Sequence, residues 1–133
     1  MPRALVTTLC DDVREELRGK HSVMGIFNRF IVSDFRNPVN TFWIYARIEL
    51  EQDGEYEFAF RFRTIEGENI FQVNAHLTTQ SEGQIPPATD LKIRIDGLRF
   101  PRHGVYELAL LHHDQVLSTV PIEVVVPSPR YIQ

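Results

Sequence analysis

The sequence is poor in cysteine and in long apolar runs. Cys10 is the only cysteine among 133 residues, so no internal disulfide can form, and such usage is typical of a reducing compartment. No window approaches the roughly 20 apolar residues of a membrane-spanning helix. The stretch from Arg3 to Asp12 is broken by threonines and ends on aspartates, which is unsuited to a signal-peptide core. We therefore expect a cytoplasmic protein with no membrane partner.

An excess of basic residues is also missing. The chain has 14 Lys and Arg against 18 Asp and Glu, a net charge of −4 and a pI near 5.7. This is the wrong sign for a protein that holds phosphate backbones through a positive surface. We therefore expect no nucleic-acid partner.

What the sequence does contain is a hydrophobic alternation of period two. The pattern is clearest from Glu55 to Thr64, where four aromatic residues fall on one face and mostly polar residues on the other. The runs 41–50 and 69–77 alternate in the same way. Such alternation is typical of antiparallel strands with one buried face, so these runs predict three consecutive strands.

Two of the connections fit hairpins when the register is tested by parity, because opposed residues share a face. Matching Leu50 with Tyr56 leaves the loop Gln52–Gly54, and matching Phe62 with Phe71 leaves Glu66–Gly67. On the outer face these registers pair Trp43 with Arg63, Tyr45 with Arg61, and Glu57 with His76.

The first two pairs predict a binding surface. Aromatic rings stack on guanidinium groups, with about 0.5–1 kcal/mol for an exposed pair, and these residue types are enriched at interface hot spots. The candidate binding residues are Trp43, Tyr45, Arg61 and Arg63. The alternative is an outer face shielded by its own arginines or by a short helix, and both interpretations stay open.

The remaining segments complete an all-β fold. Gly25 is expected to mark a bulge or a crowded point, and a short helix is expected within Asp11–Gly19 because an aspartate can cap its start. We predict an immunoglobulin-like antiparallel β-sandwich of seven to eight strands, with that helix after the first strand. The domain covers residues 1–126 and a tail covers 127–133. The further strands are expected at Arg3–Cys10, His21–Val32, Thr89–Phe100, Gly104–His112 and Val116–Val126.

Three local patterns carry a family resemblance. They are the segment Cys10–Glu16 with Gly19-Lys20, the segment Met24–Phe27, and the segment Phe100–Tyr106. Together they resemble an uncharacterised bacterial family of small immunoglobulin-like domains, which implies a fold and no activity. Gly104-Val105-Tyr106 also resembles a tyrosine corner, in which a tyrosine hydroxyl bonds back to the chain.

Three groups of residues are candidate chemical sites. Asp11, Asp12 and Glu15, with Glu16, offer carboxylates for a hard cation, but a capped helix start is favoured because no calcium-loop spacing is present. The five histidines show no ligand-like spacing, and His112 and His113 are expected on opposite faces of a strand. Cys10 is favoured as a small buried hydrophobe, although a nearby helix start would lower its pKa.

The function expected from these observations is that of a non-enzymatic module. No nucleophile elbow, phosphate-binding glycine loop or dinucleotide fingerprint is present, and we expect no cofactor. The favoured hypothesis is binding to a protein partner or to a second copy as a homodimer, through the predicted face or an exposed sheet edge. The alternative is a domain that binds a small ligand or a divalent metal, with an enzyme the least favoured.

Overall fold

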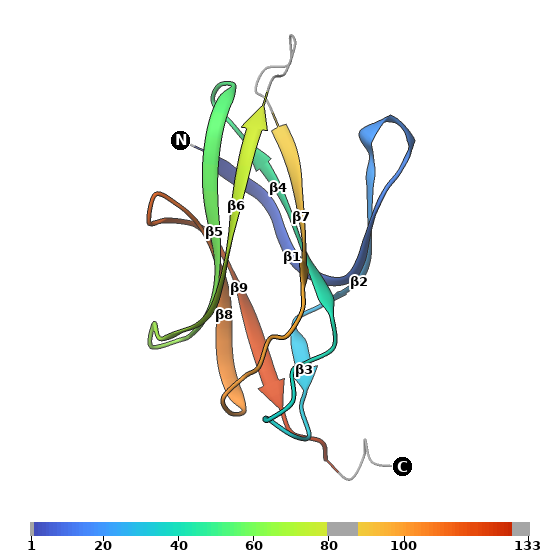
Figure 1. Ribbon diagram of the computed structural model, residues 1–133, viewed down its shortest axis with the longest axis vertical. Coiled ribbons are helices and arrows are strands. Elements are labelled where there is room, and N and C mark those ends of the chain that lie inside the picture. Colours follow the sequence, from blue (N-terminus) through green and yellow to red (C-terminus); the bar gives the residue numbers. More distant parts are fainter. Residues whose placement is uncertain (1, 80–87, 129–133) are drawn as a thin grey trace.

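The computed structural model describes residues 2–79 and 88–128 as two β-sheets packed face to face (Figure 1). One sheet, here sheet A, has the strand order β2-β1-β4-β7, and the other, sheet B, has the order β3-β9-β8-β5-β6. The strands are β1 (Arg3–Glu15), β2 (His21–Phe27), β3 (Arg29–Ile31), β4 (Phe42–Glu49), β5 (Gly54–Thr64), β6 (Asn69–Thr79), β7 (Ala88–Ile95), β8 (Gly104–His112) and β9 (Gln115–Val125).

The strand order is that of an immunoglobulin-like sandwich. Such folds place strands A, B and E side by side in one sheet and strands G, F, C and C′ in the other. Here β1-β4-β7 match the first set and β9-β8-β5-β6 the second, in the same chain order. The expected all-β sandwich is therefore confirmed, with nine described strands because the segment His21–Val32 divides at Asn28 into β2 and β3.

The core is aromatic and lies between the two sheets. The alternating residues of β5, namely Phe58, Phe60 and Phe62, are at most 2% exposed. Phe42 of β4 meets Phe62 edge to face across the sheets, with ring centroids 6.0 Å apart. Aromatic pairs in this arrangement add to the stabilisation from burial itself, so the core holds without a disulfide.

The tyrosine corner is confirmed at the start of β8. The hydroxyl of Tyr106 donates to the carbonyl oxygen of Arg102 at 2.6 Å, and the ring is buried against Phe100. Leu108 lies two residues further on, where antibody domains carry a disulfide cysteine, and is fully buried. A hydrophobic side chain thus fills the position of the bridge.

The predicted hairpin between Leu50 and Tyr56 is wrong. β4 pairs with β1 and β7 in sheet A, whereas β5 pairs with β6 and β8 in sheet B. The residues 50–53 therefore cross from one sheet to the other. Parity shows only that two strands could pair. A strand with alternating residues satisfies the same condition whether it pairs with its neighbour in sequence or with a different strand.

The second predicted hairpin is confirmed. Phe62 lies opposite Phe71, and Glu57 lies opposite His76. The register shifts by one residue after Phe62, so Arg63 faces Asn69 and the turn is longer than the two residues expected. The hydroxyl of Thr64, a buried polar side chain, accepts from the amide of Glu68 and closes this turn.

The expected helix after the first strand is wrong. β1 continues to Glu15 as a strand, followed only by a three-residue 3-10 turn, Leu17–Gly19. A helix of two turns lacks the length to stabilise itself, whereas β2 offers β1 a row of backbone partners. Leu17, which lies within the segment predicted as a helix, is 89% exposed. In Figure 1 the resulting β1–β2 hairpin stands out on the right of the molecule.

Gly25 is confirmed as a crowded point of this hairpin. Its φ is +68°, a conformation that glycine adopts readily, and a Cβ at this position would lie within 3 Å of the Asp11 side chain. The close approach of β1 and β2 therefore depends on glycine.

We predict that Tyr106→Phe lowers the free energy of unfolding by about 1–2 kcal/mol, because the buried Tyr106 side chain loses its hydrogen bond to the Arg102 carbonyl. Tyr56→Phe is the matched control, since Tyr56 donates to the carbonyl of Gln52 in the same i to i−4 relation at an exposed position. Urea unfolding of both variants measures the difference. Equal losses would contradict the assignment of Tyr106 as the structural corner.

Candidate functional site

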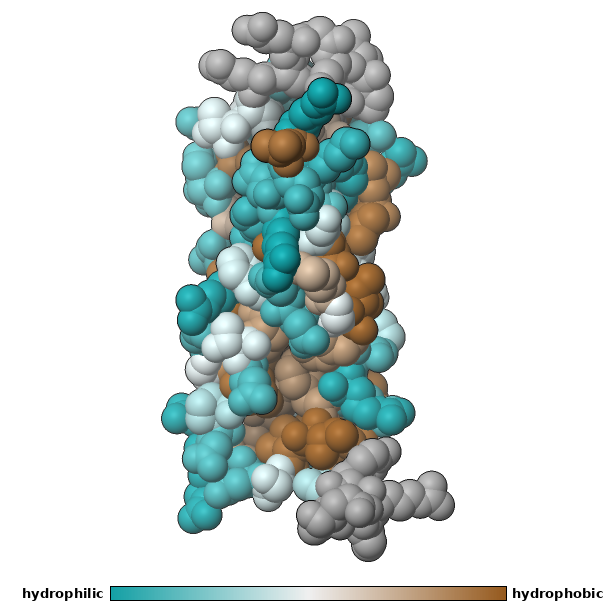
Figure 2. Space-filling view, turned by 90° about the vertical axis from the view of Figure 1, so that its right-hand side faces the viewer, coloured by the Kyte–Doolittle hydropathy of each residue, from teal (hydrophilic) through white to brown (hydrophobic). Residues whose placement is uncertain are grey.

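The outer face of sheet A is covered by the β1–β2 hairpin. Beneath it lies a small second cluster in which Cys10, Val13 and Tyr45 are buried and Val23 and Trp43 are partly buried. Figure 2 looks onto this side of the molecule, where hydrophilic side chains cover much of the surface and hydrophobic ones gather toward its right-hand margin and lower end. The hairpin shields this face in place of the helix expected from the sequence.

Asp90 of β7 joins the hairpin to the sheet. Its carboxylate accepts from the hydroxyl of Tyr45 at 2.7 Å and from the guanidinium of Arg47 at 3.1 Å. Nδ1 of His21, on β2, lies 2.8 Å from the same carboxylate, close enough for an ion pair but without the angle of a hydrogen bond. Burial, followed by the hydrogen bond to Asp90, raises the pKa of Tyr45. The contact with His21 fastens the hairpin to the sheet, and the bonds from Tyr45 and Arg47 of β4 hold Asp90 in position.

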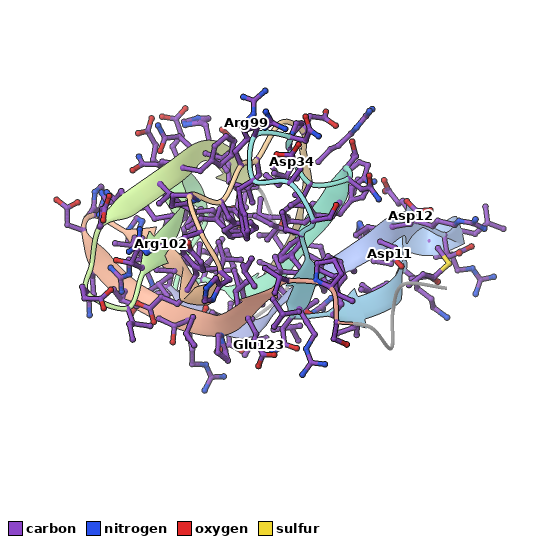
Figure 3. The ribbon with its side chains drawn as sticks, turned by 90° about the horizontal axis from the view of Figure 1, so that it is seen from below. Asp11, Asp12, Asp34, Arg99, Arg102 and Glu123 are labelled. Carbon is purple, nitrogen blue, oxygen red and sulfur yellow. The ribbon has the colours of Figure 1, made fainter. Side chains whose placement is uncertain are left out.

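The three carboxylates proposed for a metal go to different partners. Asp11 lies against Gly25, Asp12 accepts from the backbone amide of Val13, and Glu15 pairs with Lys92 at 3.4 Å. Figure 3 shows Asp11 and Asp12 on the hairpin, on the side of the molecule away from Arg102. In the described ranges no three His, Cys, Asp or Glu residues are grouped so as to hold a metal ion.

The four predicted binding residues do not share a face. Trp43 and Tyr45 lie on sheet A, where Trp43 faces Cys10 and Arg94 and Tyr45 is only 8% exposed. Arg61 and Arg63 lie on sheet B. The proposed aromatic–arginine stacks are therefore wrong, because they depended on the β4–β5 hairpin that does not form. Arg63 instead pairs with Glu107 at 2.7 Å on the neighbouring strand β8.

Arg61 does line a hollow, on the outer face of sheet B. The hollow has a volume of about 460 Å³. The Nε of Arg61 donates to the side-chain oxygen of Gln72 at 2.9 Å, and its guanidinium reaches Asp114 at 3.5 Å. Glu57 and His76 face each other at 3.5 Å, as the register predicted. The hollow thus presents both donors and acceptors, and its polar side chains are Glu57, Arg61, Gln72, Asn74, His76, His113 and Asp114.

The turn between β8 and β9 reaches this hollow with a strained backbone. His113 and Asp114 both have positive φ, 49° and 62°, at positions where hairpins usually carry asparagine and glycine. His113 therefore leaves the strand, and its ring lies 4.0 Å from that of His112 rather than on the opposite face. His113 and Asp114, the two central residues of the turn, thus adopt a backbone conformation that costs free energy. Strain of this kind often occurs at functional sites.

The edge of sheet B along β6 is a candidate binding site that the residues predicted from the sequence do not include. Among the described residues, β6 pairs with β5 and with no strand on its other side. A row of backbone amide and carbonyl groups on an edge strand can pair with another chain, and proteins usually protect such edges. The eleven residues of β6 contain no Asp, Glu, Lys, Arg, Pro or Gly.

The other edges of the described sandwich carry such protection. β7 includes Lys92 and Arg94, β3 has only three residues, and β2 bends at Gly25. The part of β9 not covered by β3 contains Pro121. Each of these features is a recognised means of preventing edge-to-edge pairing. β6 is therefore the exception among the described edge strands, and its lack of charge is visible in the sequence.

The side chains that β6 turns toward the core remain partly exposed. Phe71, Val73, Ala75 and Leu77 pack against the core but are only partly buried, whereas Phe58, Phe60 and Phe62 of the neighbouring strand β5 are buried almost completely. Because a sandwich is open along its edges, a further strand beside β6 would cover this apolar surface. The edge therefore offers both unpaired backbone groups and apolar area.

Cys10 is excluded as a nucleophile by its surroundings. The side chain is completely buried, and its sulfur lies 3.7 Å from the carbonyl oxygen of Trp43. Burial, with the negative charge of Asp11 as a second cause, raises the pKa of the thiol to about 11. The expected helix start, which would have lowered this pKa, does not form.

This pKa predicts a loss of stability at high pH. A thiol whose pKa is raised from 9.0 to about 11 on folding stabilises the protein fully below pH 9 and loses this contribution as the pH rises to 11. The loss is up to roughly 2 kcal/mol. The free energy of unfolding, measured with urea across this pH range, is expected to fall less steeply for Cys10→Ala than for wild type. Parallel slopes would contradict a buried, titrating thiol.

Comparison with known proteins identifies a family. The family model described as a family of unknown function (DUF6941) matches residues 5–125. No curated protein matches the chain. No helix in the described part of the chain is long and apolar enough to cross a membrane.

Two solved structures resemble the chain at low identity. One is an immunoglobulin-like protein from Pseudomonas aeruginosa, with 12% identity, a TM-score of 0.45, and coverage of 93% of this chain and 96% of that one. The other is a β-glucosidase from Listeria innocua in complex with gluconolactone, with 7% identity, a TM-score of 0.45, and coverage of 90% of this chain and 16% of that one. The fold assignment rests on the strand order given above, and by the match over residues 5–125 the protein belongs to the DUF6941 family of unknown function.

Proposed function

We propose that this protein is a non-enzymatic, cytoplasmic bacterial module that binds a protein partner by accepting a strand on the edge of β6. The observation that carries this proposal is the eleven-residue edge without charge, proline or glycine. In this mode of recognition, backbone hydrogen bonds supply affinity and the alternating side chains supply specificity.

The surroundings of β6 support a role in binding. Its core-facing side chains are left partly exposed, so an added strand gains apolar contact as well as hydrogen bonds. Its outward-facing residues Gln72, Asn74 and His76 line the hollow that contains Arg61. An added strand would therefore extend the sheet directly beside a polar surface that can contact its side chains.

The face around Trp43 and Tyr45 is a weaker candidate for the same role. Tyr45 is buried and its hydroxyl donates to Asp90, while Trp43 packs against the second cluster under the hairpin. A partner would have to displace the hairpin and break the contacts of Asp90 to reach these rings. Of the four residues proposed from the sequence, Arg61 and Arg63 lie on β5 next to β6, and Arg61 donates to Gln72 of β6.

A second candidate function, binding of a small polar ligand, is favoured by the hollow itself. Its volume of about 460 Å³ falls within the range of ligand pockets, and the strained turn at His113 and Asp114 reaches into it. A ligand held there would contact the Arg61 guanidinium, so a panel of carboxylates and phosphates would raise the melting temperature of wild type but not of Arg61→Gln. No shift with any member of the panel would dismiss this candidate.

Site-specific photocrosslinking in cells tests the strand-addition proposal. A photoreactive residue in place of Asn74, at the middle of β6, is expected to form a crosslink because its neighbours on the open side belong to the partner. The same residue in place of Thr119, exposed on β9 at the other side of sheet B, is the control and is expected to form none.

The contrast between these two positions decides the outcome. Crosslinks from both positions, or from position 119 alone, would contradict binding at the β6 edge. Absence of a crosslink at position 74 under conditions where the protein is abundant would reject the proposal. Crosslinks at position 74 that disappear when Gln72 is also changed to lysine would support it, because an edge lysine opposes strand pairing.

A further inference from the structure

We infer that the strand accepted by β6 is the β6 strand of a second copy of this chain, which runs antiparallel to the first about a two-fold axis at Asn74. The two five-stranded sheets would then join into one sheet of ten strands. This inference rests on the function proposed above, because it names the partner of the same edge. It goes further by fixing the orientation and the register of the pair.

The middle of β6 determines the register. Asn74 is the midpoint of Asn69–Thr79, so pairing about this residue uses the whole length of both strands. A shift by one residue would turn the core-facing residues of one copy to the outer face of the other. Larger shifts leave backbone groups at the strand ends unpaired.

The side chains that would face each other in this register are compatible. On the core side Phe71 meets Leu77 of the second copy and Val73 meets Ala75, so apolar surface left half-exposed in one copy covers that of the other. On the outer side Gln72 meets His76. Directly opposed like charges, which destabilise a sheet, do not occur because the strand carries no Lys, Arg, Asp or Glu.

The charges on the adjacent strand β5 are complementary across the proposed axis. Within one copy Glu57 faces His76, and Arg61 faces Gln72. Joining Gln72 of one copy to His76 of the other therefore produces a row with the Arg61 guanidinium at one end and the Glu57 carboxylate at the other. The two-fold axis generates this row twice. Complementary charges of this kind favour one orientation of two surfaces over others.

Sedimentation velocity over a wide range of protein concentration tests the inference. Wild type is expected to pass from monomer to dimer as the concentration rises. Asn74→Lys and Asn74→Glu each place like charges face to face at the axis and are expected to weaken the dimer by more than about tenfold. Mixing the two variants is expected to restore dimers, since lysine then faces glutamate. Thr119→Lys is the matched control and is expected to dimerise as wild type does.

A cysteine variant gives an independent readout of the register. Asn74→Cys is expected to form a disulfide between two copies under mild oxidation, because opposed residues at the axis bring their Cβ atoms within bonding range. Thr119→Cys is expected to remain reduced. Cys10 is buried and does not compete for this bond.

The results separate this inference from the proposed function. Wild type that remains monomeric at every concentration, or variants that fail to recombine on mixing, would overturn self-pairing. If position 74 nevertheless crosslinks to a different protein in cells, strand addition at β6 stands and only the identity of the partner is wrong. If position 74 crosslinks to nothing, both are rejected.

Discussion

The structure depends on the packing of phenylalanine side chains between its two sheets. Phe42, Phe60 and Phe62 are fully or almost fully buried, and Phe30 and Phe100 extend the same contact toward the tyrosine corner. This contact fixes which face of every strand points inward, and the outer faces follow from it. A two-layer sandwich also leaves its outermost strands with backbone groups that need partners, so the edges are set by the same constraint.

The two outer faces of the sandwich differ in whether other parts of the described chain cover them. Sheet A is covered by its own β1–β2 hairpin, which Asp90 and Lys92 fasten to the sheet. Sheet B carries no such cover in the described part of the chain, and its outer face holds a hollow around Arg61 beside the β6 edge. The protein thus closes one side with its own residues and presents the other, which is the arrangement expected of a surface that meets another molecule.

Much of the fold could be predicted from the sequence because hydrophobic alternation is a local signal. The alternation of β5 predicts both its strand and its buried face, and the pairing of Phe62 with Phe71 follows from a short turn. The neighbour of β4 could not be predicted in this way, since a chain that crosses between sheets has the same local pattern as one that turns back. The candidate face of Trp43 and Arg63 failed for that reason.

The helix assigned to Asp11–Gly19 failed for a related reason. Capping residues and a terminal glycine favour a helix locally, but pairing with β2 supplies backbone hydrogen bonds as far as Glu15. The β6 edge, in contrast, could have been found in the sequence, because the run Asn69–Thr79 lacks charge in a chain with 24% charged residues. What the sequence does not reveal is that this strand lies at an edge, which only the sheet order establishes.

Hydrogen–deuterium exchange of the β6 amides at increasing protein concentration tests whether the β6 edge accepts a strand. If β6 accepts the strand of a second copy, amides on its open side become protected as the concentration rises, because they then donate across the interface. Amides of the charged edge strand β7 serve as the internal reference and should exchange at a constant rate. Exchange from β6 that does not change with concentration, or protection that appears on β7 instead, would contradict pairing between copies at the β6 edge.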